Sequence, residues 1–157
     1  MKPAKTEKAE KPAKPAPPVK MEGVLRLVTV EGDGLRFEAD LAGRRVVLDS
    51  SPGATDGNPV QALLASIAAC SAMDVVDILR KKRQVITAYE VRMSGERAEE
   101  HPRRFVSLEF VHRLTGRAIQ RKAAEEALRL AHEKYCSVSA TLRPDVPARH
   151  VLEIVEG

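Results

Sequence analysis

The chain has 157 residues, a length typical of one domain, and only 3% of them are aromatic, so a core must be built from aliphatic side chains. The net charge is +4, and residues 1–20, with six Lys and two Glu, account for all of it. The neutral remainder, which has no aromatic-rich basic stretch, argues against nucleic-acid binding. Two cysteines are too few for a secreted disulfide framework. Residues 1–20 also lack the apolar segment of a secretory signal, so we expect a cytoplasmic protein.

Residues 1–20 are rich in lysine, proline, alanine and glutamate and offer almost nothing to bury. This composition predicts a disordered tail, which is either a passive solubilising extension or a tether to an acidic partner. We place the folded domain at residues 21–157.

The first part of this domain has an extended pattern. Residues 24–30 are rich in β-branched side chains, residues 35–39 alternate between apolar and polar, and residues 45–48 form a third short segment. Glycine-containing turns separate the three segments. The pattern predicts a three-stranded antiparallel meander.

A long helix is predicted from Asn58 to Arg83. Asn58 suits the N-cap and Pro59 the first helical position. The segment is apolar on nearly every side, so we expect it to be buried on nearly every side. Asp74 and Asp77 argue against a membrane span, because ionised groups are costly in hydrocarbon. Asp77 is placed to pair with a basic residue three or four positions later.

The second half alternates strands with a helix. Residues 88–93 and 105–114 have period-two patterns and predict a hairpin with a long polar connection. Residues 118–135 have helical spacing, with an apolar stripe made by Ala124, Ala127, Leu128, Ala131 and Tyr135. Residues 137–142 and 150–155 predict two further strands. The order of the elements indicates an α+β domain.

The two cysteines occupy different surroundings. Cys70 lies in the middle of the long helix, too far from its N-terminus for the dipole to lower the thiol pKa, whereas Asp74 and apolar burial would raise that pKa. The local sequence leaves open whether Cys70 is an inert core residue or a thiol activated by another part of the fold. Cys136 follows the second helix directly, at a junction where we expect a thiol to be accessible.

The four histidines, at positions 101, 112, 132 and 150, lack metal-ligand spacing. We therefore expect no metal, and no phosphate-binding loop or other motif indicates a cofactor. His132 precedes Cys136 by four positions on the same helical face. It is either a proton acceptor for that thiol or a half-exposed helix residue.

Two segments resemble one family. Asn58-Pro59 with the following ALLASIAACSAMDVV resembles the signature helix of the OsmC/Ohr family of thiol peroxidases, and EKYCSV around Cys136 is similar to its second cysteine motif. The resemblance covers about residues 22–155 and is stronger to the OsmC-like branch of uncertain function than to the organic-hydroperoxide reductases. It implies an OsmC-like α+β fold with antiparallel sheets around a long central helix. It also implies an interlocked homodimer with two sites at the subunit interface.

The resemblance further implies a two-cysteine chemistry. Cys70 corresponds to the cysteine that attacks a hydroperoxide, and Cys136 to the one that resolves the sulfenic acid into a disulfide. An external dithiol, a dihydrolipoyl protein in the family, then reduces the disulfide.

Two expected residues are missing. The hydroperoxide reductases carry a glutamate directly after the Asn-Pro, where this chain has Val60, and an arginine in the segment before the helix, which has no match here. Arg36, Arg44 and Arg45 are the nearest candidates to supply that cation. Without it, two alternatives stay open: a dimeric protein that binds a small ligand or senses redox state, and a structural dimer with inert thiols.

Overall fold

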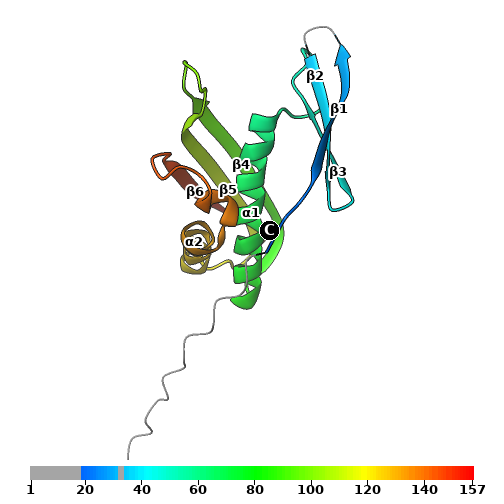
Figure 1. The fold of residues 1–157 in the computed structure, drawn as a ribbon. Coiled ribbons are helices and arrows are strands. Elements are labelled where there is room, and N and C mark those ends of the chain that lie inside the picture. Colours follow the sequence, from blue (N-terminus) through cyan, green and yellow to red (C-terminus); the bar gives the residue numbers. More distant parts are fainter. Residues whose placement is uncertain (1–18, 32–33) are drawn as a thin grey trace, which may run out of the picture.

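The computed structural model describes residues 19–31 and 34–157, so the predicted tail lies almost wholly outside the described residues. Two three-stranded sheets and a long helix, α1 (Pro59–Lys81), organise the fold. Figure 1 shows the sheet β1–β2–β3 on one side of α1, with the sheet β4–β5–β6 and α2 on the other. The α+β class is confirmed.

The first sheet is the predicted meander. β1 (Val24–Glu31), β2 (Gly34–Leu41) and β3 (Arg44–Asp49) pair antiparallel in sequence order. Ala42 and Gly43 connect β2 to β3 with positive φ angles of 53° and 80°, the geometry that tight hairpin turns require. Asp40 Oδ1 accepts a hydrogen bond from the Gly43 N–H at 2.8 Å and secures this turn.

The start of α1 matches the prediction. Asn58 is the N-cap, and its side-chain oxygen accepts hydrogen bonds from the backbone N–H groups of Val60 and Gln61 at 3.0 Å each. The Gln61 side chain accepts from the Asn58 N–H in return, which completes a capping box. Near the other end, Lys81 Nζ lies 2.6 Å from Asp77 Oδ2, as the spacing predicted.

The second sheet is mixed. β4 (Val85–Arg97) and β5 (Phe105–Arg117) form the predicted antiparallel hairpin, but β6 (Ala148–Glu156) joins β5 in parallel, which corrects the expectation of purely antiparallel sheets. Alternate side chains of β5 are buried: Leu108, Phe110, His112 and Leu114.

The segment before β6 corrects two predictions. The helix predicted from residue 118 begins later, as α2 (Arg121–Leu130), because the φ of 48° at Ala118 is not helical. α2 then continues as a π-helical turn, η1 (Ala131–Tyr135). The strand predicted over residues 137–142 is wrong, because the segment begins with a short helix, α3 (Ser137–Ala140). The Cys136 sulfur accepts a hydrogen bond from the Ser139 N–H, and such local side-chain bonds compete with extended structure.

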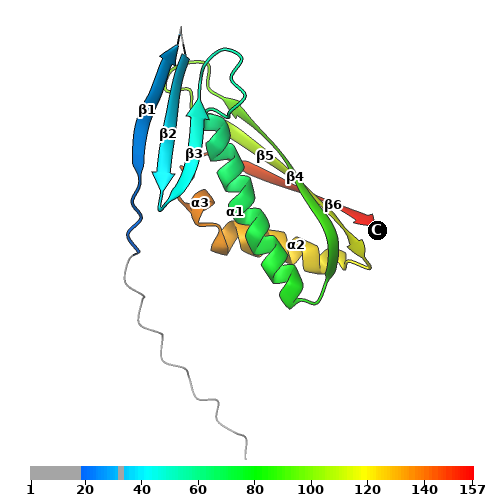
Figure 2. The same ribbon diagram turned by 90° about the vertical axis from the view of Figure 1, so that its right-hand side faces the viewer.

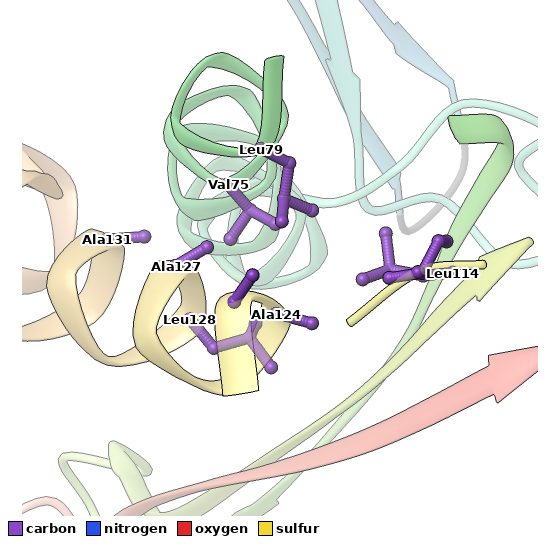
Figure 3. Packing of buried hydrophobic residues seen from close by; sticks show 9 residues of the cluster. Val75, Leu79, Leu114, Ala124, Ala127, Leu128 and Ala131 are labelled. Carbon is purple, nitrogen blue, oxygen red and sulfur yellow. The ribbon is translucent and has the colours of Figure 1, made fainter. Parts of the chain in front are cut away.

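Small residues bring α1 and α2 together. Val75 and Leu79 of α1 face Ala124 and Ala127 of α2, as Figure 3 shows, and all four are buried. Tyr135, predicted on the same stripe, is 48% exposed. In η1 the Cys136 N–H donates to Ala131 O, five residues back, so the wider turn rotates the last residues away from the stripe.

Within one chain α1 is not buried on nearly every side. Leu63 and Met73 are 40% and 72% exposed. The helix is long and apolar enough to span a membrane by length and composition alone, yet it packs on α2 and β4 in this fold. The expectation of near-complete burial therefore fails for a single subunit.

Candidate functional site

Cys70 and Cys136, 66 positions apart in the sequence, meet where α1 passes the junction between η1 and α3, a region visible in Figure 2. Both cysteines are free thiols. The two side chains lie close enough to act on each other: Cys136 raises the pKa of the Cys70 thiol, and Cys70 lowers the pKa of the Cys136 thiol. Of the two thiols, Cys136 is therefore the one whose surroundings favour loss of the proton.

Cys136 is only 3% exposed, so the expectation of an accessible thiol is wrong. Its sulfur accepts two hydrogen bonds from Ser139, one from the hydroxyl at 3.1 Å and one from the backbone N–H at 3.4 Å. Burial raises the pKa of the Cys136 thiol, but the bonds from Ser139, together with the Cys70 and Ser71 side chains, bring the pKa below its ordinary value.

Ser71 adds a second hydroxyl beside this sulfur. It follows Cys70 on α1 and is 3% exposed. Among the described residues its Oγ has no well-oriented hydrogen-bond partner, although it lies near enough to Cys136 to help lower the pKa of that thiol. Ser71 is therefore a weaker donor than Ser139.

Cys70 is half-buried and experiences opposite influences. The backbone N–H of Val138 lowers the pKa of its thiol, while burial, Cys136 and Asp74 raise it, and the net effect is a raised pKa. The influence of Asp74 and of burial is the one that the sequence predicted. The surroundings therefore favour ionisation at Cys136 more than at Cys70.

The three candidate arginines lie away from the thiols. Arg36 forms ion pairs with Asp56 and with Asp49, the latter at 3.3 Å, and so ties β2 and β3 to the loop before α1. Arg45 pairs with Glu38, and Arg44 is exposed at the start of β3. In the described part of a single chain, no hydrogen bond or ion pair joins any of these arginines to either cysteine.

His132 belongs to a different cluster. Its ring packs on His150 with centroids 4.2 Å apart, and its Nδ1 is buried with no hydrogen-bond partner among the described residues. His112, fully buried, pairs through Nδ1 with the Tyr89 hydroxyl at 2.7 Å and through Nε2 with His150 Nδ1 at 3.0 Å. Burial lowers the pKa of His112 and of His150 to about 4.

Sequence reasoning missed this cluster. The available signal was the position of His112 on the apolar face of residues 106–114, which places an imidazole in the core. In the described ranges, no group of three or more His, Cys, Asp or Glu side chains is arranged to hold a metal ion. The cluster instead joins the buried ring of His112 to the half-buried rings of His150 and His132.

A cavity of about 290 Å³ borders the thiol site. Ser139, which donates to Cys136, and Ile67, one turn before Cys70, are both in its wall. The remaining lining mixes the polar side chains of His132 and Arg143 with apolar ones: Leu108, Ala140, Leu142, Pro144, Val146 and Ala148. A small molecule with both polar and apolar parts can therefore approach the side of the site that Ser139 forms.

A family model described as OsmC-like protein matches residues 52–151, which include α1 and both cysteines. The chain belongs to the OsmC-like family. Protein YhfA of Escherichia coli is 37% identical to it over 124 residues, which cover 78% of this chain and 92% of YhfA.

Two solved structures show the same OsmC-like fold. A hypothetical protein from Aquifex aeolicus superposes with a TM-score of 0.78 at 29% identity, covering 88% of this chain and 98% of that one. The organic hydroperoxide resistance protein OhrB of Bacillus subtilis superposes with a TM-score of 0.57 at 20% identity, covering 86% and 98%. The second likeness concerns the fold alone.

Proposed function

We propose that this OsmC-like protein is a two-cysteine peroxidase that reduces organic hydroperoxides, or hydrogen peroxide, with an external dithiol. The observation that carries the proposal is that Cys70 and Cys136 lie close enough for each thiol to shift the pKa of the other. Two neighbouring thiols can form a disulfide when the chain brings their sulfurs together. Membership of a family that includes proteins named for organic hydroperoxide resistance supports a peroxide substrate.

The exposure of the thiols supports the order of the steps. Cys70 is half-buried and Cys136 is almost fully buried, so a peroxide reaches Cys70 first. Cys70 attacks the terminal oxygen of the hydroperoxide, releases an alcohol or water, and becomes a sulfenic acid. Cys136 then condenses with it to a disulfide, which a dihydrolipoyl protein or a similar dithiol reduces by exchange. The cavity beside Ser139, lined by both polar and apolar side chains, offers space for the organic part of the substrate.

The exposed apolar surface supports a homodimer. Large apolar side chains are exposed on the β1–β2–β3 sheet and along α1: Val24, Leu25, Leu27, Val28, Leu35, Leu41, Val46, Leu63 and Met73. Surface of this extent indicates an interface. Met73 lies one turn after Cys70, so a second copy on this face would also cover the thiol site and place it between the subunits.

The test is peroxide turnover. The wild type is expected to consume cumene hydroperoxide and hydrogen peroxide with dihydrolipoamide as reductant, and Cys70→Ser is expected to lose this activity. Peptide mapping after one equivalent of hydroperoxide should show a disulfide between Cys70 and Cys136. Wild-type turnover no faster than that of Cys70→Ser would refute the proposal.

A second candidate function is a dimeric protein that binds a small ligand or senses redox state. The observation in its favour is the raised pKa of the Cys70 thiol, with no arginine of the described chain against it. This function predicts slow oxidation of Cys70 without catalytic recycling by dihydrolipoamide. The turnover assay therefore distinguishes it from the peroxidase.

A further inference from the structure

The missing arginine leaves a specific chemical problem at Cys70. A thiol must lose its proton before it attacks a peroxide, and among the described residues no cation of the same chain contributes to the pKa of this thiol. The groups that act on the pair from the elements around it are Asp74 and Ser71 on α1 and Val138 and Ser139 on α3. Asp74 is the one charged group among them, and its charge opposes ionisation of Cys70.

The sulfur of Cys136 can accept the proton of Cys70, because hydrogen-bond donors surround it. Cys136 accepts hydrogen bonds from the Ser139 hydroxyl and backbone N–H, at 3.1 Å and 3.4 Å, and the nearby Cys70 side chain also lowers its pKa. Donors that converge on one buried sulfur stabilise a thiolate there, because hydrogen bonds to an ionised acceptor are stronger than those to a neutral one. The Ser71 hydroxyl, buried and unpartnered among the described residues, adds to this environment.

We propose that Cys136, held as a thiolate by Ser139, is the general base that takes the proton of Cys70 when Cys70 attacks the peroxide. This inference rests on the proposed function and deepens it. Cys136 acts twice: it activates Cys70 before it resolves the sulfenic acid. An anion next to the attacking thiol thereby replaces the cation that is absent.

Every proton and electron of the proposed cycle is accounted for. The Cys70 proton moves to Cys136, the Cys70 sulfur forms a bond to the terminal oxygen of ROOH, and the O–O bond breaks to release RO⁻. This alkoxide takes the proton from Cys136 and leaves as the alcohol ROH, so Cys136 is a thiolate again. Cys136 then attacks the Cys70 sulfenic acid, the disulfide forms, and hydroxide leaves and is neutralised by solvent. Two electrons pass from the two sulfurs to the peroxide.

The charge on Cys136 is tested first without peroxide, by following thiolate ultraviolet absorbance of the reduced full-length protein against pH. We expect the wild type to form its first thiolate at lower pH than Cys136→Ser. Ser139→Ala should move the first ionisation upward by about one pH unit, because one hydrogen bond to the thiolate is lost. Ser139→Thr, which keeps the hydroxyl, should restore it. Ser137→Ala, in the same turn but exposed, is the matched control and should titrate like the wild type.

The role of Cys136 as a base is then tested in a single turnover with cumene hydroperoxide and no reductant. If Cys136 only resolved the sulfenic acid, Cys136→Ser would form the Cys70 sulfenate as fast as the wild type, and that result would overturn the inference. We expect it about tenfold slower near neutral pH, with the rate recovering as the pH rises. Ser139→Ala should show the same upward shift in its rate profile as in its titration. If Ser139→Ala does not fold, Ser71→Ala should give a smaller shift in the same direction.

Two further results have clear meanings. A sulfenate trapped on Cys136 in Cys70→Ser, formed at the wild-type rate, would make Cys136 the nucleophile and overturn the inference. A wild type that consumes no hydroperoxide would refute the peroxidase itself. The thiolate titration would still establish, in that case, which cysteine carries the charge, so the two failures are distinguishable.

Discussion

Mild acid is expected to destabilise the protein through the buried histidines. His112 is fully buried, and burial lowers its pKa to about 4 from an ordinary value of 6.5. An unfolded chain therefore binds a proton at His112 as the pH falls through 6.5, while the folded protein does so only near 4. Neutral His112 therefore contributes its full stabilisation above pH 6.5, the pKa in the unfolded chain, and this stabilisation is lost as the pH falls toward 4, the pKa in the folded protein. The difference between the two pKa values corresponds to about 3 kcal/mol.

The groups around His112 also keep its pKa low. The Tyr89 hydroxyl pairs with Nδ1, and burial raises the pKa of Tyr89, so it stays neutral and provides no negative charge to a protonated imidazole. His150 pairs with Nε2 and also has a pKa lowered to about 4, by burial first and then by His132 and His112. Within the described part of the chain no carboxylate contributes to the pKa of either ring, so a proton added to one ring is opposed by any charge on its neighbours.

The assay is urea unfolding followed by far-ultraviolet circular dichroism, in steps from about pH 7 to pH 4, for the wild type and His112→Gln. Glutamine keeps hydrogen-bonding groups but does not titrate. We expect the wild type to lose about 3 kcal/mol more than His112→Gln over this range. The difference between the two curves is the relevant quantity, because Asp49, whose pKa is lowered, also loses stabilising charge in acid. His101→Gln, in an exposed loop, is the matched control. Parallel curves for the wild type and His112→Gln would refute this account of the cluster.

Three further predictions concern the fold and its assembly. Asn58→Ala removes the acceptor of the Val60 and Gln61 N–H groups and should cost about 1 kcal/mol of stability, measured by thermal unfolding. Gly116→Ala would place a methyl group 2.0 Å from Val85 O and should cost about 2 kcal/mol or more, whereas Gly57→Ala, with its nearest atom at 3.9 Å, should be nearly neutral. Met73→Glu puts a charge on the exposed apolar face of α1 and should convert a dimer to a monomer in size-exclusion chromatography. A wild type that elutes as a monomer would contradict the proposed interface.

Local patterns in the sequence were sufficient for much of the fold. The meander, the capped start of α1, the β4–β5 hairpin and most of α2 follow from periodicity, turn residues and capping within a few positions. The resemblance of the two cysteine segments indicated the family, which the family match confirms. Such signals are reliable because the side chains that create them lie close together along the chain.

The thiol site required information that no local pattern contains. The distribution of charge between Cys70 and Cys136 depends on Ser139 and Val138, which approach α1 only because residues 137–140 are helical rather than extended. The extended pattern of that segment was misleading, since six residues are too few to distinguish a strand from a turn that a cysteine sulfur caps.

By itself the sequence determined that the chain forms an α+β domain with a long apolar helix at its centre and one cysteine in the middle of that helix. Only the tertiary structure decided that Cys136 is buried, that it lies near Cys70, and that its pKa is lowered while that of Cys70 is raised. The physical reason is that the pKa of a thiol depends on donors within a few ångströms of the sulfur. For Cys136 one of the groups that lower the pKa is Cys70, 66 positions away in the sequence, and folding alone brings it there.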